Sequence, residues 1–143
     1  MPLIWPSYFA ITNTPRPDVP GKLVATVLGT PDPPALAAFY RDLLGWEITS
    51  SEPHWARLRH PDDDRPGLSF QLERDHAWPV WPQHPGTQQM QAHLDVQVDD
   101  LEAETARAVT LGATVEGHQP QPDGVRVIRD PHGHLICLFL QGF

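Results

Sequence analysis

The feature that most constrains the fold is an internal repeat. Residues 22–48 read KLVATVLGTPDPPALAAFYRDLLGWEI, and residues 90–116 read MQAHLDVQVDDLEAETARAVTLGATVE. Each segment has a strand pattern, a turn that carries aspartate, a helical pattern, a glycine and a second strand. Without a gap before the turn, Ala25 aligns with His93 and Asp32 aligns with Asp100. The period of about 68 residues is too long for a solenoid and predicts two similar halves packed into one domain.

The helices of the repeat carry end signals. Asp32 is placed to cap the first helix, Pro33 or Pro34 suits its first turn, and Gly45 suits a left-handed residue after its last turn. Between these ends, apolar residues recur at helical spacing and predict one buried face. In the second half, Asp99 and Glu102 have the spacing of a capping box.

Two further strand patterns complete each half. The stretches WARLRHP and VRVIRDP match in outline, and LSFQLE matches LICLFLQ, an alignment that sets Gln71 opposite Cys137. Each half is therefore predicted to run strand–helix–strand–strand–strand, and many strands with few helices indicate an α+β fold. We expect a single domain over residues 22–143, with halves at about 22–75 and 90–141, preceded by a proline-rich arm at residues 1–21.

Charge and cysteine content exclude several classes of protein. The chain of 143 residues carries a formal net charge of −8 and shows no basic patch, so neither nucleic acid nor an anionic membrane is an expected partner. No stretch approaches the ~20 apolar residues of a membrane span, and the N-terminus lacks the basic segment of a signal peptide. Cys137 is the one cysteine, which excludes an internal disulfide and favours a reducing, cytoplasmic location.

Three pieces of the sequence carry a family resemblance: PDPPALAAFYRDLLGWE, HLDVQVDDLEAETARAVTLGA and RDPHGHLICLF. With the doubled βαβββ pattern, they make residues 22–139 resemble the vicinal oxygen chelate superfamily, which contains glyoxalase I, extradiol dioxygenases, fosfomycin-resistance enzymes and bleomycin-binding proteins. The stretches LAAFYRDLLGWE and HLDV are most similar to its glyoxalase-like subgroup. The resemblance implies two βαβββ modules that form a cupped mixed sheet with helices on the outer faces, and it implies a homodimer.

In that superfamily a divalent metal takes ligands from up to four equivalent strands that line the cup. The resemblance places these positions at Ala25, Gln71, His93 and Cys137, and side-chain alternation along the strands turns all four toward the cup, with Asp95 on the same face as His93. Ala25 has no donor atom, and His93 is the one strong ligand of the usual kind. We therefore expect no cofactor, with His93 as the candidate ligand if a divalent metal binds.

The cup is predicted to hold a small molecule. Tryptophans gather in or near the first half, and flat side chains beside a cup suit a planar or aromatic ligand. No catalytic residue is assigned, because no sequence signal pairs a nucleophile with a base. The residues expected to contact the ligand are Trp46, Trp55, Gln71, His93, Asp95, Cys137 and Phe139.

Two functions stay open at this point. The first is a metal-free protein that binds a small organic molecule in the cup, like the bleomycin-binding branch. The second is a metal-dependent lyase or dioxygenase of the same superfamily with an atypical ligand set. The fold does not decide between them, because function resides in the site.

The motif DPHGH contains another pair of histidines, His132 and His134. Asp130 and Pro131 followed by Gly133 indicate a tight turn before the last strand. We therefore expect both histidines at the surface of that turn.

Overall fold

The computed structural model describes residues 20–143. The first half contains β1 (Ala25–Thr30), α1 (Pro33–Leu44), β2 (Glu47–Glu52), β3 (Trp55–Arg59) and β4 (Gly67–Leu72). The second half contains β5 (Leu94–Gln97), α2 (Leu101–Leu111), β6 (Thr114–Val115), β7 (Val125–Arg129) and β8 (Leu135–Phe139). This order confirms the predicted α+β fold of two βαβββ modules. The arm expected at residues 1–21 lies outside the described residues, apart from its last two.

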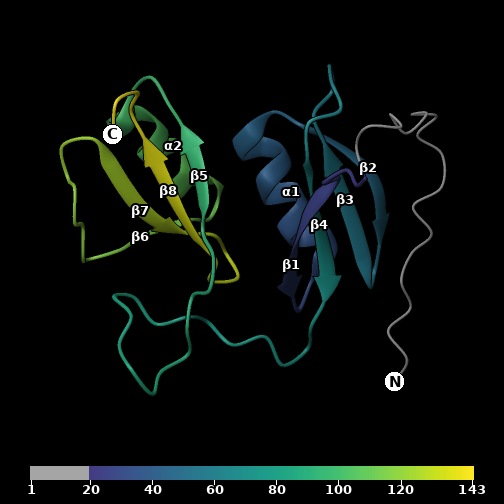
Figure 1. Cartoon of the computed structure of the whole chain (residues 1–143), viewed down its shortest axis with the longest axis horizontal. Coiled ribbons are helices and arrows are strands. Elements are labelled where there is room, and N and C mark those ends of the chain that lie inside the picture. The colour runs from purple at the N-terminus through teal and green to yellow at the C-terminus, as the bar shows by residue number, and fades with distance from the viewer. Residues whose placement is uncertain (1–19) are drawn as a thin grey trace.

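Each half builds its own four-stranded mixed sheet, and the two sheets lie side by side (Figure 1). The strand orders are β1-β4-β3-β2 and β5-β8-β7-β6. In both sheets the first and last strands of the half are parallel neighbours, and the other pairs are antiparallel. The first strand of each half is therefore an edge strand of its sheet.

The start and end of α1 follow from its sequence. The Asp32 carboxylate accepts a hydrogen bond from the backbone N–H of Ala35 at 3.1 Å, which satisfies one of the free amides of the first turn. Gly45 ends the helix with φ of 71°, a left-handed conformation that residues with a side chain rarely adopt. Both end signals are confirmed.

The start of α2 differs from the prediction. The capping residue is Asp100, whose carboxylate accepts from the backbone N–H of Ala103 at 3.0 Å. The capping box of Asp99 and Glu102 is therefore wrong, because the helix begins at Leu101, one residue later than that pairing requires. The repeat had aligned Asp100 with Asp32, and these are the two caps.

The helices cover one face of each sheet, and apolar side chains fill the space between. Residues with helical spacing on α1 pack against alternate residues of the strands, as the period of two along a strand requires. The central members of this core include Leu36, Tyr40, Leu58, Phe70, Ile128, Ile136 and Leu138. Within residues 20–143, no helix is both long and apolar enough to cross a membrane.

The opposite face of each sheet, which we call the cup face, carries the intervening residues. In the first half these are Ala25, Val27, Gly29, Trp55, Arg57, Ser69 and Gln71, and in the second half they are Asp95, Gln97, Val127, Cys137 and Phe139. The predicted division of each strand into a core face and a cup face is confirmed.

Polar contacts join the two halves. The hydroxyl of Tyr40 on α1 donates to the carboxylate of Asp130 at 2.6 Å. Arg107 on α2 donates to the carbonyl oxygens of Asp42 and Leu43, both at 2.8 Å, where α1 ends. A cation is stabilising at that position, because the last carbonyl groups of a helix lack partners within the helix.

His132 and His134 also lie between the halves, so the prediction of surface histidines is wrong. His134 Nε2 donates to the carbonyl oxygen of Gly29 at 2.7 Å, and His132 Nδ1 lies 2.5 Å from Thr30 Oγ1. Both contacts are part-buried, because the turn between β7 and β8 lies against the end of β1 and not in solvent. We call His132, His134 and the adjacent His76 the histidine seam.

Candidate functional site

Three side chains predicted to line the cup converge on the second half. β5 and β8 are parallel neighbours, and their register puts Asp95 beside Cys137 on the cup face. His93 lies one residue before β5, and its Nε2 is 3.0 Å from Asp95 Oδ1. The possible ligand atoms of all three residues lie within 4.8 Å of one another. We call this group the cup cluster.

The cup cluster is open to solvent, and its environment shifts the pKa of the Cys137 thiol. The side chains of His93 and Asp95 are 40% and 62% exposed, whereas Cys137 is half-buried. Burial raises the pKa of the Cys137 thiol above its ordinary value, and the negative charge of Asp95 raises this pKa further. Cys137 is therefore a neutral thiol at pH 7 and not an activated nucleophile.

The cup face of the first half has a different character. On β1 it presents Ala25, Val27 and Gly29, none of which has a side chain that can bind a metal or transfer a proton. On β4 the amide of Gln71 donates to Glu73 at 2.9 Å. The register of β3 with β4 places Trp55 beside Gln71.

The cup face of the first half, which we call the first wall, also carries a basic side chain that sequence reasoning overlooked. Arg59 donates to the carbonyl oxygens of Leu58 and Leu68 at 2.8 and 2.9 Å, and its Nη2 lies 3.4 Å from Ser69 Oγ. The alternation of WARLR on β3 contained the signal, since it puts Trp55, Arg57 and Arg59 on one face.

The strand register changes one equivalence between the halves. Val27 pairs with Ser69 and Gly29 with Gln71, whereas Asp95 pairs with Cys137 and Gln97 with Phe139. With Ala25 equivalent to His93, Ser69 is therefore the counterpart of Cys137. The sequence alignment of Gln71 with Cys137 was wrong by two residues, a shift that leaves every side chain on the same face and so is invisible to alternation.

Comparison with known proteins decides the family. The family model described as "Glyoxalase-like domain" matches residues 25–139, from the start of β1 to the end of β8. The chain belongs to the glyoxalase-like domain family. No curated protein matched the chain in a sequence comparison.

Solved structures share this glyoxalase-like fold at low sequence identity. A glyoxalase/bleomycin resistance protein/dioxygenase family enzyme from Burkholderia phytofirmans PsJN is 16% identical, with a TM-score of 0.63 over 84% of this chain and 98% of that one. The bleomycin-binding protein from Streptomyces verticillus, complexed with copper(II)-bleomycin, is 20% identical, with a TM-score of 0.52 over 85% and 98%. The antibiotic-binding protein TnmS3 from Streptomyces sp. CB03234 is 21% identical, with a TM-score of 0.52 over 84% and 95%.

The metal that the superfamily implies does not fit the usual positions in this glyoxalase-like chain. Ala25 offers no donor, and Ser69 is a fully buried hydroxyl that is near Arg59. Among residues 20–143, the one group of histidine, cysteine and carboxylate side chains close enough to share an ion is the cup cluster. Its imidazole, carboxylate and thiol come from one half and suit a borderline or soft cation such as Zn²⁺.

The remaining predicted contact residues divide between two locations. Trp46 packs against the hydrophobic core, with its ring 5.9 Å from that of His60, and so lies on the core side of its sheet. Trp55 is on the cup face and 4% exposed, and Phe139 is on the cup face next to Val125. The structure therefore brings Asp95, Cys137 and His93 together but does not place Trp46 with them.

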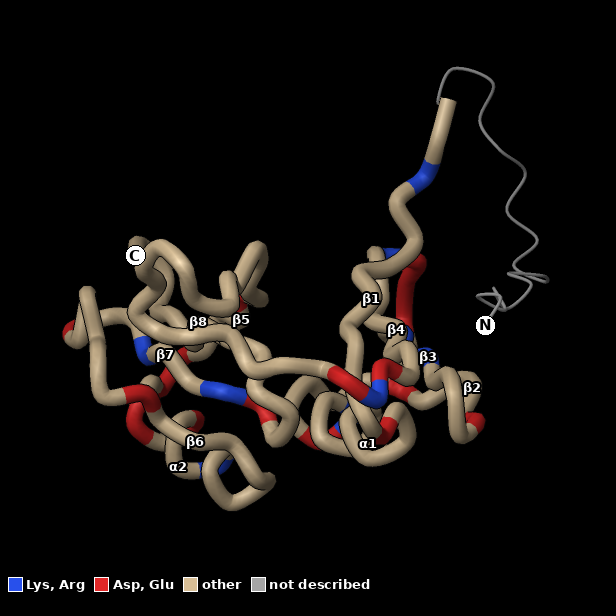
Figure 2. The backbone as a smooth tube through the Cα atoms, turned by 90° about the horizontal axis from the view of Figure 1, so that it is seen from below, with Lys and Arg blue, Asp and Glu red and all other residues tan. Residues whose placement is uncertain are grey.

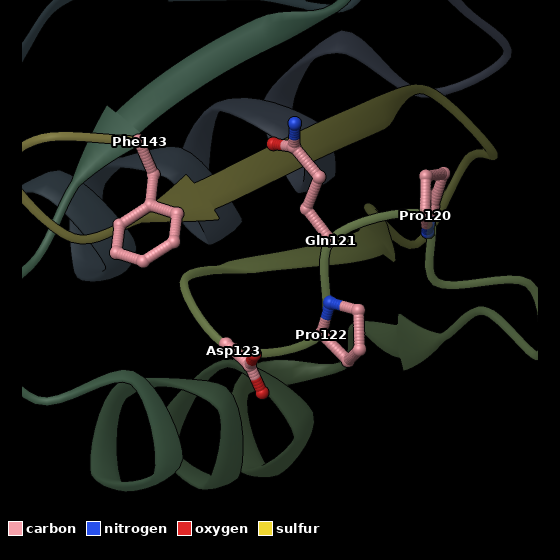
Figure 3. Close-up of a pocket in the computed structure, with 5 residues that line it drawn as sticks. All are labelled: Pro120, Gln121, Pro122, Asp123 and Phe143. Carbon is pink, nitrogen blue, oxygen red and sulfur yellow. The ribbon is translucent and has the colours of Figure 1, made fainter.

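Two pockets in the described part of the chain are lined by none of the cup-cluster residues. One is near the C-terminus (Figure 3) and is lined by Pro120, Gln121, Pro122, Asp123 and Phe143. The other lies between the end of α1 and the start of α2, and Leu43, Val98, Glu104 and Arg107 are among its lining residues. Neither contains a group of residues that the sequence had marked as functional.

Charged residues are spread over both halves, as the backbone coloured by charge shows (Figure 2). Several basic side chains are bound to acids, including Lys22 to Asp64 and Arg65 to Asp63. That nucleic acid is not a partner stays a prediction from the net charge.

Proposed function

We propose that this glyoxalase-like protein binds a small organic molecule, aromatic or planar, against its cup face and performs no metal chemistry of the usual superfamily kind. The observation that carries the proposal is the composition of the first wall, where Ala25 stands at the position of a usual metal ligand and the exposed Val27 adds apolar surface on the same strand. Flat and apolar side chains with a few polar groups suit an organic ligand. Two structural neighbours, which are described as bleomycin-binding and antibiotic-binding, support this choice.

Side chains on the cup face would contact a ligand in two ways, by apolar packing and by hydrogen bonds. Val27 and Phe139 supply apolar contact, and Gln71 and His93 supply hydrogen bonds that orient the ligand. A homodimer, as the family resemblance implies, would add a second chain beside the cup. We infer a cytoplasmic location from the single free cysteine.

Metal-free bleomycin is the probe for the first test. We expect the full chain to bind it, with a change in tryptophan fluorescence or a calorimetric signal. Phe139→Ala is expected to weaken this binding about tenfold, since a buried aromatic contact is worth roughly 1–2 kcal/mol. Phe143→Ala is the matched control, because Phe143 is 61% exposed beside the C-terminal pocket. An absence of bleomycin binding, or equal losses in both variants, would overturn the proposal.

The cup cluster favours a second candidate, a metal-dependent lyase or dioxygenase with an atypical ligand set. Three protein ligands with a free coordination position are the usual pattern of a catalytic divalent site. His93, Asp95 and Cys137 are the residues that would hold the ion. A bound divalent cation supplies a Lewis acid that polarises a substrate oxygen.

Metal content distinguishes the two candidates. The protein is purified without added metal and titrated with Zn²⁺ against a chromophoric chelator. On the first proposal, His93→Ala leaves the weak uptake of Zn²⁺ unchanged. One equivalent of tightly held metal, lost in His93→Ala and kept in the control His84→Ala, would replace the first proposal by the second. The control is matched, because the His84 side chain lies exposed in the linker.

A further inference from the structure

The histidine seam is separate from the cup cluster and joins the two halves. His76 follows β4, whereas His132 and His134 lie in the turn between β7 and β8. His134 Nε2 donates to Gly29 O, and His76 Nε2 donates to His132 O at 2.9 Å. Because a carbonyl oxygen only accepts, these two ring nitrogens carry protons. The proposed ligand site uses none of the three side chains.

The rings of His76 and His134 are stacked. Their centroids lie 4.7 Å apart with an interplanar angle of 28°, and both residues are half-buried. Two neutral imidazole rings stack without electrostatic cost, whereas two imidazolium rings at this distance repel each other. Partial burial of His76 adds to this penalty, because it disfavours the charged form of that ring.

We propose that His76, His132 and His134 form a proton-controlled joint, which holds the two halves together while the rings are neutral and loosens when acid charges the stacked pair. The joint acts on the cup directly, because Gly29 is a cup-face residue of β1 and His134 lies just before β8. Loosening it moves the first wall of the cup relative to the second.

Some charged groups around the seam favour protonated histidine rings, and others disfavour them. Asp130, which favours charged rings, is already bound to the hydroxyl of Tyr40 and to the backbone N–H groups of His132 and His134. Arg129, which disfavours charged rings, donates to the carbonyl oxygen of Gly133 at 3.1 Å and pairs with Glu116. The acids of the first half, Asp32, Glu73 and Asp75, are engaged at the α1 cap and with Gln71 or lie exposed.

The balance of these groups favours a neutral His76. Its pKa is lowered from the ordinary value of 6.5, chiefly by burial and next by the charge of His134, although the hydrogen bond to the His132 carbonyl and the charge of Asp130 act in the opposite sense. As pH falls below 6.5, the unfolded chain therefore binds more protons than the folded chain, in which the pKa of His76 is lower. The joint therefore contributes its full share to the stability of the folded state above the ordinary histidine pKa, and this share is lost progressively as pH falls below it.

Thermal unfolding of the full chain at about pH 7.5 and about pH 5.5 tests the joint. We expect the unfolding midpoint of the wild type to fall by several degrees in acid. His76→Gln keeps an amide donor for the His132 carbonyl but has no ring to charge, so its midpoint is expected to fall by about half as much. His84→Gln, an exposed linker position, is the matched control and is expected to show the full wild-type fall. An equal fall in all three proteins would overturn the proposal.

Amide hydrogen exchange on the wild type provides a test without substitution. After correction for the intrinsic effect of pH, the backbone amides of Asp32, His132 and His134 are expected to lose protection in acid before the amides shared by β3 and β4. These three amides bond to Thr30 Oγ1 or to the Asp130 carboxylate at the seam. If they keep their protection as fully as the β3–β4 pair, the joint does not open and the proposal fails.

Discussion

The hydroxyl of Tyr40 donates a hydrogen bond of 2.6 Å to Asp130 Oδ2, which ties α1 of the first half to the end of β7 in the second. The Tyr40 side chain is fully buried, and Asp130 is 1% exposed. Burial raises the pKa of Tyr40 well above its usual range, and the Asp130 charge raises this pKa further. The phenol therefore remains protonated and a donor at neutral pH.

Removing this donor is expected to destabilise the fold. Tyr40→Phe leaves one oxygen of a buried carboxylate without its partner, and we expect the free energy of unfolding to fall by about 1–3 kcal/mol in a denaturant titration. The control is Thr110→Ala, which removes the exposed bond of Thr110 Oγ1 to Ala106 O and is expected to change stability by less than about 0.5 kcal/mol. Equal effects would show that Asp130 does not need the phenol.

Arg129 is expected to be the most costly basic side chain to replace. It pairs with Glu116, with the two side chains 10% and 17% exposed, and donates to the carbonyl oxygen of Pro79 at 2.7 Å. Arg129→Met leaves these acceptors buried without their cation, and we expect a loss of about 3–5 kcal/mol.

Arg65 provides the matched control for this substitution, because its pair with Asp63 is exposed. Arg65→Met is expected to cost at most about 1 kcal/mol in the same denaturant titration. The interpretation of Arg129 as a structural cation fails if the two variants are equally stable.

Gly133 combines a left-handed backbone with close contact. Its φ is 94°, and a Cβ at this position would overlap the indole ring of Trp78. Gly133→Ala is therefore expected to lower the unfolding midpoint by more than Gly86→Ala, a control that has φ of 80° but no atom within 4 Å of the added Cβ. The difference between the two midpoints measures the contact with Trp78 alone, and its absence would mean that the ring moves away freely.

The reactivity of Cys137 is expected to report on Asp95. Because burial and the Asp95 charge both raise the pKa of the thiol, its alkylation at about pH 8 is expected to be slower than that of free cysteine and to keep rising above pH 9. Asp95→Asn removes the adjacent charge, lowers the pKa of Cys137 and accelerates alkylation. Asp99→Asn, at an exposed position before the α2 cap, is the control and is expected to react like the wild type. Since Cys137 is the one cysteine, the label reports on this site alone.

The sequence predicted the local features of the fold. The repeat gave the order of elements in each half, and Asp32 and Gly45 marked the ends of α1 as the structure has them. These features depend on interactions between residues close in the chain and on the periods of 3.6 and 2 along helix and strand, so the pattern of side chains is sufficient to show them.

Only the tertiary structure decided which residues meet. The sequence put Asp95 on the same face as His93, but bringing Cys137 to them requires the parallel pairing of β5 with β8. The side-chain pattern did not predict the strand register, because a shift of two residues leaves the alternation unchanged. Such a shift replaces Gln71 by Ser69 as the counterpart of Cys137.

The histidine seam shows the same limit most clearly. His132 and His134 lie in a sequence that is typical of an exposed turn, and the turn is present, but a strand from the other half covers it. The environment of a turn depends on how distant segments pack, and the physical properties of the turn residues do not encode that packing. The sequence by itself therefore determined the two modules and the faces of their strands, whereas the joint between the modules and the cluster on the cup face were decided by long-range packing.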